Sequence, residues 1–565
     1  MEPILDIRNL NVEFALESGE ILRAVQEVSL SVGAGEIHAL VGESGAGKST
    51  IGAAVMGLLE HPGRVSAGEI RICGEWMDPA TGQAAGVVAG RDVGAIFQDP
   101  MTSLNPLFTI SSQLSETMRH HLGLSAAAAR ARSLDLLRSV GIPEPERRLD
   151  FYPHQLSGGQ RQRVVIAAAL SCNPRFLIAD EPTTALDVSV QAQILKLIRQ
   201  LTQERQLGVL LVTHNMGVVA EIADQVSIMA QGRIVESGPV VEILGAPKHP
   251  YARALIGAVP RIDKRLDRLP TPNEETPKSA AARAAVRDKA LRQGRRAPSA
   301  GPLLEVSGLT VEYRSGAGFM GLGARRFRAV DDVSFTVAEG EIFGLVGESG
   351  CGKTTVANSI AGLIRPTAGD VKLNGEALHQ TRRHQGRQDL QMIFQDPYSA
   401  LNPRLRVGSA LAEPILFYRL ARNQAEAEAD VGILLEAVGL DASAATRFAH
   451  AFSGGQRQRV SIARALGAQP RLLICDEPTS SLDVSVQAQI LNLLKDLRDA
   501  TGLSLLFISH DLAVVRQLCD RVGVMRAGKI VEQADGESLF ANPQHAYTRE
   551  LLSLVPSMDK IAPAA

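Results

Sequence analysis

Ile178-Ala179-Asp180-Glu181-Pro182 is an apolar run that ends in two adjacent carboxylates, and Ile474-Cys475-Asp476-Glu477-Pro478 repeats it 296 residues later (476 − 180). A buried strand of a parallel sheet reads as a continuous apolar run, and ligands gather at the carboxyl ends of such strands. Many parallel strands also end in a solvated carboxylate, so the run alone is weak evidence. The motifs that surround both copies in the same order carry the interpretation.

A glycine-rich loop precedes each acid pair, and both loops match GxxxxGK[ST] between an expected strand and an expected helix. Glycines let backbone N–H groups turn inward, the helix N-terminus adds positive potential, lysine neutralises phosphate oxygens and the hydroxyl ligates Mg²⁺. We therefore expect two phosphate-binding loops. Their residues are Gly42, Glu43, Ser44, Gly45, Ala46, Gly47, Lys48, Ser49 and Thr50, and Gly347, Glu348, Ser349, Gly350, Cys351, Gly352, Lys353, Thr354 and Thr355.

The acid pairs have the residue types that phosphoryl transfer to water needs. In a P-loop enzyme the strand-terminal aspartate holds Mg²⁺ through water, and the glutamate that follows is placed to accept a proton from the attacking water. An isolated glutamine and a later strand-terminal histidine in each half can orient that water or bridge the phosphate and the metal. The expected catalytic residues are Glu181, His214, Gln98, Glu477, His510 and Gln395, and the expected Mg²⁺ residues are Ser49, Gln98, Asp180, Thr354, Gln395 and Asp476.

The landmarks recur at offsets of 305 for the loop lysines (353 − 48), 297 for the glutamines (395 − 98) and 296 for the histidines (510 − 214), so the offset is constant only from the glutamines onward. This constancy predicts one duplicated unit, with a first domain at 1–260 and a second at 303–565. Between them, residues 261–302 hold 11 basic and 5 acidic residues and few large apolar ones. We expect a flexible or partly helical linker there, whose net charge of +6 could alternatively touch lipid headgroups or RNA.

Within each half, short apolar strands alternate with longer helical patterns, which predicts an α/β fold with a mainly parallel sheet. Residues 36–41 are an expected strand and 48–59 the helix after the first phosphate loop. Residues 111–170 have few strand-like runs and show helical spacing, so we expect a helical insertion there. Its counterpart in the second half is expected at about 405–466.

Composition excludes several classes of protein. The formal net charge of −2, with 21% charged residues, implies no global attraction to nucleic acid or to an anionic membrane. Five scattered cysteines without CxxC spacing argue against a disulfide framework, a zinc site or an iron-sulfur cluster, and fit a reducing cytoplasm. We find no signal-peptide pattern and no apolar run near the roughly 20 residues of a spanning helix, so we expect membrane association only through other proteins.

The segments Leu156-Ser-Gly-Gly-Gln160 and Phe452-Ser-Gly-Gly-Gln456, each followed by Arg-Gln-Arg, resemble the signature of ATP-binding cassette transporters. The likeness covers nearly the whole chain outside the linker. It implies two P-loop NTPase domains, each with a RecA-like α/β core, an N-terminal antiparallel β subdomain and a helical insertion, and it implies ATP and Mg²⁺ as cofactors. The signature residues implied to contact nucleotide are Ser157, Gly158, Gly159 and Gln160, and Ser453, Gly454, Gly455 and Gln456.

In that family two cassettes dimerise head to tail, with ATP between the phosphate loop of one and the signature of the other. The resemblance implies an intramolecular dimer in which the Lys48 site uses Ser453 and Gly455, and the Lys353 site uses Ser157 and Gly159. The facing D-loops would be residues 185–187 and 481–483. Adenine usually stacks on an aromatic residue, for which Phe14 and Tyr313 are candidates, although each could equally pack against its own sheet.

Two further stretches resemble the oligopeptide, dipeptide, nickel and glutathione importers. They are the Gln-Asp-Pro segments at 98–106 and 395–403 and the tails at 249–260 and 545–556. Because both halves carry both stretches, the resemblance implies a fused form of subunits that are often separate. Some relatives have an iron-sulfur cysteine cluster after the tail, but no cysteine lies at 173–350 or after 519, so that cofactor is not expected.

The resemblance implies an ATPase that energises uptake of short peptides or peptide-like solutes, of the dipeptide, oligopeptide, glutathione or microcin type. It would lie peripherally on the cytoplasmic face of a bacterial inner membrane, with two permease subunits, an extracytoplasmic solute-binding protein and no nucleic acid. Alternatives are a soluble tandem cassette acting on ribosomes or DNA and a fused sugar importer. The prolines of the linker and the missing metal cysteines disfavour the ribosome and DNA factors, and sugar importers often have an incomplete second catalytic set.

Overall fold

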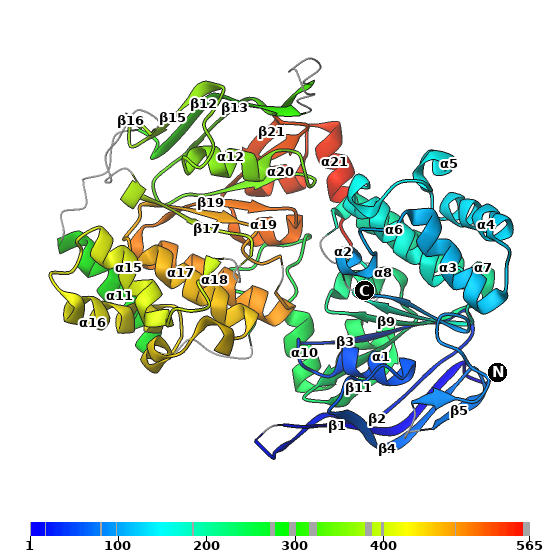
Figure 1. Ribbon diagram of the computed structural model, residues 1–565. Helices are drawn as coiled ribbons and strands as arrows, with labels where there is room; N and C mark the ends of the chain where they lie inside the picture. Colours follow the sequence, from blue (N-terminus) through cyan, green and yellow to red (C-terminus); the bar gives the residue numbers. More distant parts are fainter. Residues whose placement is uncertain are drawn as a thin grey trace. The chain divides into compact units, whose positions relative to one another are not determined.

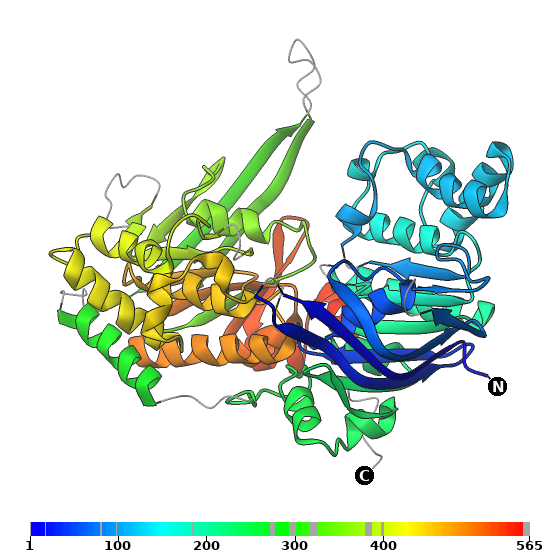
Figure 2. The ribbon, with the colours of Figure 1, turned by 60° about the horizontal axis from the view of Figure 1, so that its bottom comes forward.

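The computed structural model describes residues 2–16, 18–78, 82–97, 99–183, 186–271, 277–292, 301–315, 325–378, 387–396, 400–480 and 482–556. The chain divides into two units. The first comprises Met1–Gly257 with the segment that starts at Pro556, and the second comprises Ala258–Val555. Each unit contains an antiparallel sheet, a mainly parallel sheet and a group of helices (Figures 1 and 2).

The N-terminal sheet of the first unit is antiparallel. Its order is β2-β1-β4-β5-β6, and β1 pairs antiparallel with both β2 and β4. Alternating residues of β1, such as Leu5 and Ile7, are buried, so one face of this sheet packs on the core. The strands are β1 (Leu5–Ala15), β2 (Ile21–Val32), β4 (Gly63–Ile72), β5 (Glu75–Asp78) and β6 (Gln83–Ala84).

The second sheet of this unit positions the chemistry. Its order is β11-β10-β3-β9-β8-β7, in which all neighbours pair in parallel except the antiparallel edge strand β11. Because β9 lies between β3 and β8, the carboxyl ends of these three strands meet at one edge of the sheet. The strands are β3 (Ile37–Gly42), β7 (Val93–Ile96), β8 (Phe176–Asp180), β9 (Gly208–Thr213), β10 (Gln225–Ala230) and β11 (Arg233–Pro239).

The helices of the first unit fall into a group around the parallel sheet and a helical insertion. Side chains of Thr109 and Ser125 cap the first two long helices of the insertion by accepting backbone N–H bonds, which fixes where those helices begin. The insertion contains α2 (Pro100–Ser103), α3 (Ile110–Leu122), α4 (Ala126–Ser139), α5 (Pro145–Arg148) and α6 (Gly158–Ala169). The other helices are α1 (Lys48–Met56), α7 (Val188–Arg205), α8 (Met216–Ile222), α9 (Val240–Gly245) and α10 (Pro250–Gly257).

The second unit repeats both sheets. The antiparallel sheet has the order β13-β12-β15-β16, and the mainly parallel sheet has the order β17-β18-β19-β14-β20-β21, again with an antiparallel edge strand. The strands are β12 (Leu304–Ser315), β13 (Arg325–Val337), β14 (Ile342–Val346), β15 (Ala368–Leu373), β16 (Glu376–Ala377), β17 (Leu390–Ile393), β18 (Leu472–Asp476), β19 (Ser504–Ser509), β20 (Arg521–Arg526) and β21 (Lys529–Asp535).

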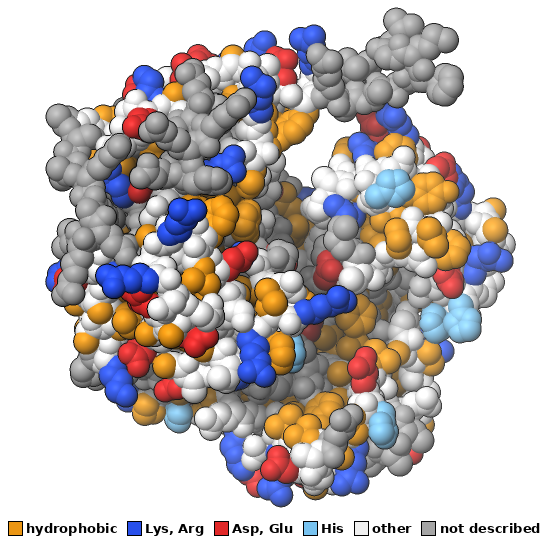
Figure 3. Space-filling model, turned by 60° about the vertical axis from the view of Figure 1, so that its left-hand side comes forward, with side chains coloured by type: hydrophobic (Ala, Val, Ile, Leu, Met, Phe, Trp, Pro, Cys, Tyr) orange, Lys and Arg blue, Asp and Glu red, His pale blue; other side chains and the backbone are white. Residues whose placement is uncertain are grey.

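Its helices also correspond to those of the first unit. The helical subdomain contains α15 (Val407–Phe417), α16 (Gln424–Ala437) and α17 (Gly454–Leu466), and the α/β core carries α12 (Lys353–Ile360), α18 (Val484–Thr501), α19 (Leu512–Leu518), α20 (Gly536–Ala541) and α21 (Ala546–Ser553). The expected fold class is therefore confirmed in both halves. No helix among the described residues is long and apolar enough to cross a membrane, and Figure 3 shows acidic and basic side chains interspersed over one face.

The expected linker, residues 261–302, is described at 261–271, 277–292 and 301–302. A helix, α11 (Pro277–Arg292), covers its centre, as the expectation of partial helicity allowed. The described parts at 258–271 and 277–289 belong to the second unit, because they pack against it with buried side chains such as Leu269 and Ala282. These described parts therefore lie in the second compact unit, which starts at Ala258, and the domain boundary at 303 stays a prediction.

Candidate active sites

The two phosphate loops have the same internal geometry. Nζ of Lys48 donates to the carbonyls of Gly42 and Glu43, both at 2.8 Å. Nζ of Lys353 donates in the same way to Gly347 at 2.8 Å and to Glu348 at 3.0 Å. Both lysines are buried at the start of a helix, so each ammonium is held inside the curve of its loop. A phosphate group in that curve would meet a positive charge and a helix N-terminus.

Glycine is required at the last loop position before each lysine. Gly47 has φ of 100° and Gly352 has φ of 109°, values that side-chain-bearing residues rarely adopt. A Cβ on Gly47 would lie 2.5 Å from the carbonyl oxygen of Ala24, and one on Gly352 would lie 2.3 Å from that of Ala329. The loop therefore packs directly on backbone of the antiparallel sheet, and its shape is fixed by the fold.

Each loop hydroxyl reaches the aspartate of its unit. The Thr354 hydroxyl donates to Oδ1 of Asp476 at 3.3 Å, and the Ser49 hydroxyl hydrogen-bonds Asp180. Burial raises the pKa of Asp180, and burial raises the pKa of Asp476 to about 6, although these hydroxyls and the loop lysines oppose the shift. A hydroxyl beside a carboxylate is a hard oxygen donor set of the kind that Mg²⁺ prefers.

The expected base and its helpers converge in the second unit. Oε1 of Glu477 lies 3.1 Å from Nδ1 of His510, and Oε2 of Glu477 accepts a hydrogen bond from Nε2 of Gln395 at 2.9 Å. In the first unit, Oε1 of Glu181 lies 2.8 Å from Nδ1 of His214. Gln98 lies outside the described residues. The structure thus brings together every described member of the expected catalytic set within its own unit.

The two glutamates have an unusual backbone conformation that sequence patterns do not signal. Glu181 and Glu477 both have φ of 47°, in the left-handed region where a glutamate is uncommon. The N–H of Glu181 donates to Val212 at 2.8 Å, and that of Glu477 donates to Ile508 at 3.0 Å, so the adjacent strand holds each residue in place. Strained residues of this kind cluster at functional sites, where the surrounding structure enforces them.

The charges of the second cluster depend on one another. Burial opposes ionisation of Glu477, but the nearby His510 and the charge of Lys353 outweigh it and hold the pKa of Glu477 below its usual range. Burial likewise opposes protonation of His510, but Glu477 outweighs it and raises the pKa of His510. Glu477 is therefore kept as a carboxylate, the form that can accept a proton.

The signature segments form helix starts. In each, the serine side chain accepts the N–H of the glutamine three residues later, and that glutamine accepts the N–H of the serine, which makes a capping box. These pairs are Ser157 with Gln160 and Ser453 with Gln456. Gly159 and Gly455 instead face valines of α7 and α18, where an added Cβ would lie 2.6 Å and 2.2 Å from the valine methyls.

The two aromatic candidates for adenine stacking lie in different surroundings. Phe14, on β1, is partly buried and packs against the core of the antiparallel sheet. Tyr313, on β12, is 42% exposed. Tyr313 therefore has a free face that a base could cover, whereas part of Phe14 is already used in packing. Of the D-loops, Leu186, Asp187, Leu482 and Asp483 are described, while Ala185 and Ser481 are not.

Sequence reasoning missed one contact of the C-terminal tail. The hydroxyl of Tyr547, on α21, accepts the N–H of Glu348 in the phosphate loop at 3.4 Å. His545 caps the same helix by accepting the N–H of Tyr547, and Glu532 accepts the N–H of His545. The His-x-Tyr pattern of the tail was visible in the sequence, but nothing in it indicated that the tyrosine reaches a loop about 200 residues away.

Comparison with known families identifies the class of protein that this fold and these sites define. The model of the ABC transporter family matches residues 25–184 and 330–480, more than half of the chain. The chain belongs to the ABC transporter family, and it is an ATPase.

A second match narrows the class. The model described as the oligopeptide/dipeptide transporter C-terminal region matches residues 235–285 and 531–563, which contain both tails that the sequence singled out. Among similar proteins is the glutathione import ATP-binding protein GsiA of Pectobacterium atrosepticum, 46% identical over 98% of this chain and 90% of its own length. The protein of that name from Escherichia coli K12 is 45% identical over 98% of this chain and 89% of its own. The chain is thus the tandem ATPase subunit of an ABC importer.

A solved ATP-binding cassette, MJ0796 in a dimeric structure with ADP and phosphate, is 28% identical over 42% of this chain and 98% of its own length, with a TM-score of 0.37.

Proposed function

We propose that this chain couples ATP hydrolysis at two composite sites to the uptake of glutathione or other short peptide-like solutes. The observation that carries the proposal is the duplication of a complete set of groups, in which lysine, hydroxyl, aspartate, glutamate and histidine meet at one sheet edge in each unit. A set that was needed for binding alone would not require the paired Glu477 and His510, or Glu181 and His214.

Each described group has a role in this proposal. Lys48 and Lys353 neutralise the β- and γ-phosphates, while Ser49 with Asp180, and Thr354 with Asp476, would hold Mg²⁺, which offsets charge on the phosphates. Glu181 and Glu477 accept the proton of the attacking water. His214 and His510 keep these carboxylates oriented, and Gln395 can place water beside Glu477.

The γ-phosphate side of each site would be completed by the signature of the other cassette. The open helix start at Ser157 to Gly159, and its copy at Ser453 to Gly455, offers backbone N–H groups and a positive helix end to an anion. ATP would then hold two cassettes together, and hydrolysis would release them. Supporting this, a Cβ added to Gly158 would meet nothing within 4 Å and one added to Gly454 would meet Leu482 at 3.8 Å, so the space beside both helix starts is open.

The partners and the location follow from the import role. We infer two permease subunits that span the membrane and an extracytoplasmic protein that delivers the solute, with this chain at the cytoplasmic face of the inner membrane. The names of the glutathione importer relatives and the duplicated oligopeptide/dipeptide region favour a short peptide-like solute over a sugar.

Replacing both loop lysines tests the proposal. Lys48→Ala with Lys353→Ala should abolish ATP hydrolysis by the purified chain and uptake of labelled glutathione by cells that carry the matching permeases. Lys196→Ala, which removes an exposed lysine of α7, is the matched control and should leave both activities intact. Continued hydrolysis by the double variant would refute the ATPase sites, and loss of hydrolysis with uptake retained would refute the transport role.

A further inference from the structure

The linker packs on the second cassette through contacts to its own backbone, which a solvated tether would not make. The side chain of Gln517, on α19, accepts the N–H of Leu266 at 2.8 Å and donates to the carbonyls of Arg261 and Lys264, both at 2.7 Å. Asn492, on α18, accepts the N–H of Leu269 at 3.0 Å and donates to its carbonyl at 2.8 Å. Both side chains are buried, so these bonds are shielded from water.

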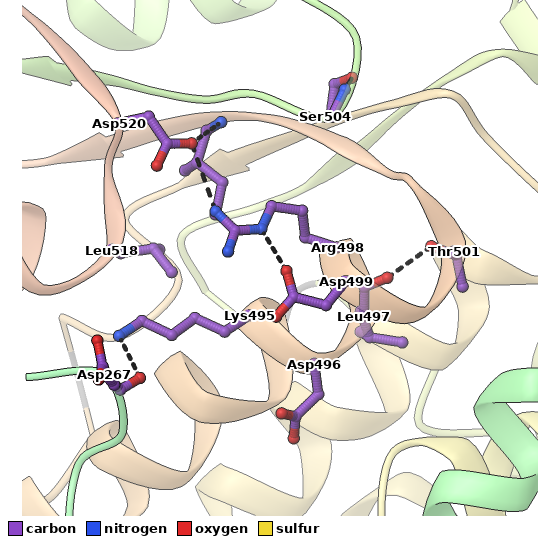
Figure 4. A network of polar contacts seen from close by, with 12 residues as sticks. Asp267, Lys495, Asp496, Leu497, Arg498, Asp499, Thr501, Ser504, Leu518 and Asp520 are labelled. Atoms are coloured by element: carbon purple, nitrogen blue, oxygen red, sulfur yellow. Dashed lines mark hydrogen bonds and ion pairs between the residues drawn. The ribbon is translucent and has the colours of Figure 1, made fainter. Parts of the chain in front are cut away.

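Charged groups surround these backbone contacts. Nζ of Lys495 donates to the carbonyls of Leu266 and Asp267 at 2.9 Å and 3.0 Å, and Figure 4 shows the Lys495 side chain reaching the linker at Asp267. Arg268 pairs with Asp496 at 3.0 Å. Arg265 lies 3.3 Å from Asp520, which Arg498 approaches from α18 at 3.4 Å. Leu269 completes the site by inserting into the apolar core of this unit.

The first cassette lacks this docking site, as positions 296 residues earlier show. Lys196 replaces Asn492, and Glu221 replaces Gln517; both are exposed in the first unit. Arg199 replaces Lys495 and donates two hydrogen bonds to Asp224, at 2.7 Å and 2.8 Å. The copy of Asp224 in the second cassette, Asp520, pairs instead with Arg265 of the linker. The duplicated surface has therefore diverged at Asn492, Lys495 and Gln517, three positions that contact the linker, while the aspartate is kept in both halves.

Charge also favours docking of the linker helix on the second cassette rather than on the first. α11 carries five basic residues and one acid, and it packs along α16, whose charged residues are all acidic (Figure 1). Lys289 of α11 pairs with Asp430 of α16. The two helices align from their N-caps, Ser125 of α4 and Asn423 of α16, which places Arg132 opposite Asp430 in the alignment. α4 carries three arginines and one aspartate. Like charges would thus repel α11 from the first helical subdomain.

One side chain of α11 bridges the two parts of the second cassette. Arg283, which is only 5% exposed, donates to the carbonyl of Ala437 at the end of α16 at 3.2 Å and lies 3.7 Å from Asp496 on α18. α16 belongs to the helical subdomain and α18 to the α/β core. Figure 2 shows α11 beside the helices of this unit. The helix therefore spans the joint between the two subdomains.

We propose that the described parts of the linker, residues 261–271 and 277–289, form an intramolecular strap, which docks on the second cassette alone and joins its helical subdomain to its α/β core. The two cassettes of the chain then cycle unequally, because only one has its subdomains restrained. The mechanical part of this inference rests on the proposed function, since it assumes that ATP binding and hydrolysis move one subdomain relative to the other. The docking part does not depend on it.

Hydrogen–deuterium exchange on the full chain, without nucleotide, tests the docking. In the wild type, peptides from 261–271 and 277–289 should exchange at least about tenfold more slowly than an unstructured peptide. Asn492→Ala with Gln517→Ala should remove that protection, whereas the matched pair Lys196→Ala with Glu221→Ala in the first cassette should leave it unchanged. Unprotected exchange in the wild type, or equal loss in both pairs, would overturn the proposal.

A second test exchanges charges in the Lys289–Asp430 pair and is independent of whether Asn492→Ala with Gln517→Ala misfolds. Asp430→Arg installs the residue of the first cassette and should speed exchange over 277–289 by at least about threefold. Adding Lys289→Glu should restore slow exchange, because the pair is then re-formed with its charges reversed. If Asp430→Arg leaves exchange unchanged, or the second change does not restore it, α11 is not held by this pair and the assignment fails.

ATP turnover tests the restraint. A variant whose strap is released, as exchange shows, should hydrolyse ATP at least about threefold faster than the wild type in the absence of permeases, because a restraint on subdomain movement has been removed. Released strap with unchanged turnover would overturn the coupling role alone. Absence of ATP hydrolysis in the wild type would instead overturn the proposed function, while leaving the exchange result on docking intact.

Discussion

Nδ1 of His510 lies 3.1 Å from Oε1 of Glu477, and the two groups set each other's charge. Glu477 raises the pKa of His510 against the effect of burial, and His510 lowers that of Glu477. The ion pair therefore persists at every pH between the lowered carboxyl pKa and the raised imidazole pKa. Its contribution to stability is lost when pH falls through the first or rises through the second. This window includes the mildly acidic range where an ordinary histidine begins to lose its proton.

Removing the histidine should shift the pH profile of hydrolysis. In His510→Ala the pKa of Glu477 rises, because burial is no longer countered by the imidazolium, so less base is ionised at low pH. We expect turnover at the second site, measured with Glu181→Gln to silence the first, to fall more at pH 6 than at pH 8. His450→Ala, at an exposed histidine of the same unit, is the control. An equal fall at both pH values would show that His510 does not act through Glu477.

Neutralising both expected bases should separate binding from hydrolysis. Glu181→Gln with Glu477→Gln keeps the shape of each site but removes the group that accepts the proton, and general bases typically contribute about 10²–10⁴-fold. Turnover should fall by about that factor, while a fluorescent ATP analogue still binds. Glu428→Gln, an exposed glutamate of α16, should change neither property. Turnover that stays within threefold of the wild type would rule out these glutamates as bases.

Motif spacing predicted the fold, and it also predicted which candidate residues would lie together, because these residues stand at strand ends. Once residues 178–182 were interpreted as a strand, the order of motifs placed Lys48, Asp180 and His214 at one sheet edge, and the structure has them there. The left-handed backbone of Glu477 could not be predicted in this way. It depends on a hydrogen bond to Ile508 on the neighbouring strand, and glutamate itself has no preference for that conformation.

The linker shows a different limit of sequence interpretation. Its composition is that of a solvated segment, and the large apolar residues of 261–271 are Ile262, Leu266 and Leu269. Its contacts include those from Asn492 and Gln517, which lie more than 200 residues away in the chain and bond to the linker backbone. Comparison of the two halves shows that Lys196 and Glu221 of the first half stand where the second half has Asn492 and Gln517. This difference can be linked to docking of the linker only after the contacts are known.

The buried aspartate of the second site should cost stability when no nucleotide is bound. Asp476 is 3% exposed, and burial raises its pKa to about 6 from 3.8, so the folded state resists its ionisation. Stability therefore falls as pH rises from about 4 to 6 and stays lower above. Asp476→Asn should raise the free energy of unfolding by about 2–3 kcal/mol at pH 8 and by much less at pH 4.

Thermal unfolding of the nucleotide-free chain at both pH values checks this expectation. Asp499→Asn, at a carboxylate whose side chain is 65% exposed, is the control and should change stability little at either pH. A destabilisation by Asp476→Asn of equal size at pH 4 and pH 8 would mean that the carboxylate is needed as a hydrogen-bond acceptor more than it is disfavoured as a charge.

The two adjacent glycines of each signature differ in the space around them, so we expect alanine to affect stability differently at the two positions. A Cβ on Gly455 would lie 2.2 Å from Cγ1 of Val486, whereas a Cβ on Gly454 would have Leu482 as its nearest neighbour at 3.8 Å. Gly455→Ala should therefore destabilise the chain by about 1–3 kcal/mol, as overpacking does, and Gly454→Ala should not. Val486→Ala removes the clashing methyl groups, so stability should recover when it is combined with Gly455→Ala. The first cassette offers a replicate, since Gly159 faces Val190 at 2.6 Å and Gly158 faces open space. If thermal unfolding shows equal losses for Gly454→Ala and Gly455→Ala, or no recovery with Val486→Ala, the second glycine is not there to let the signature helix approach α18.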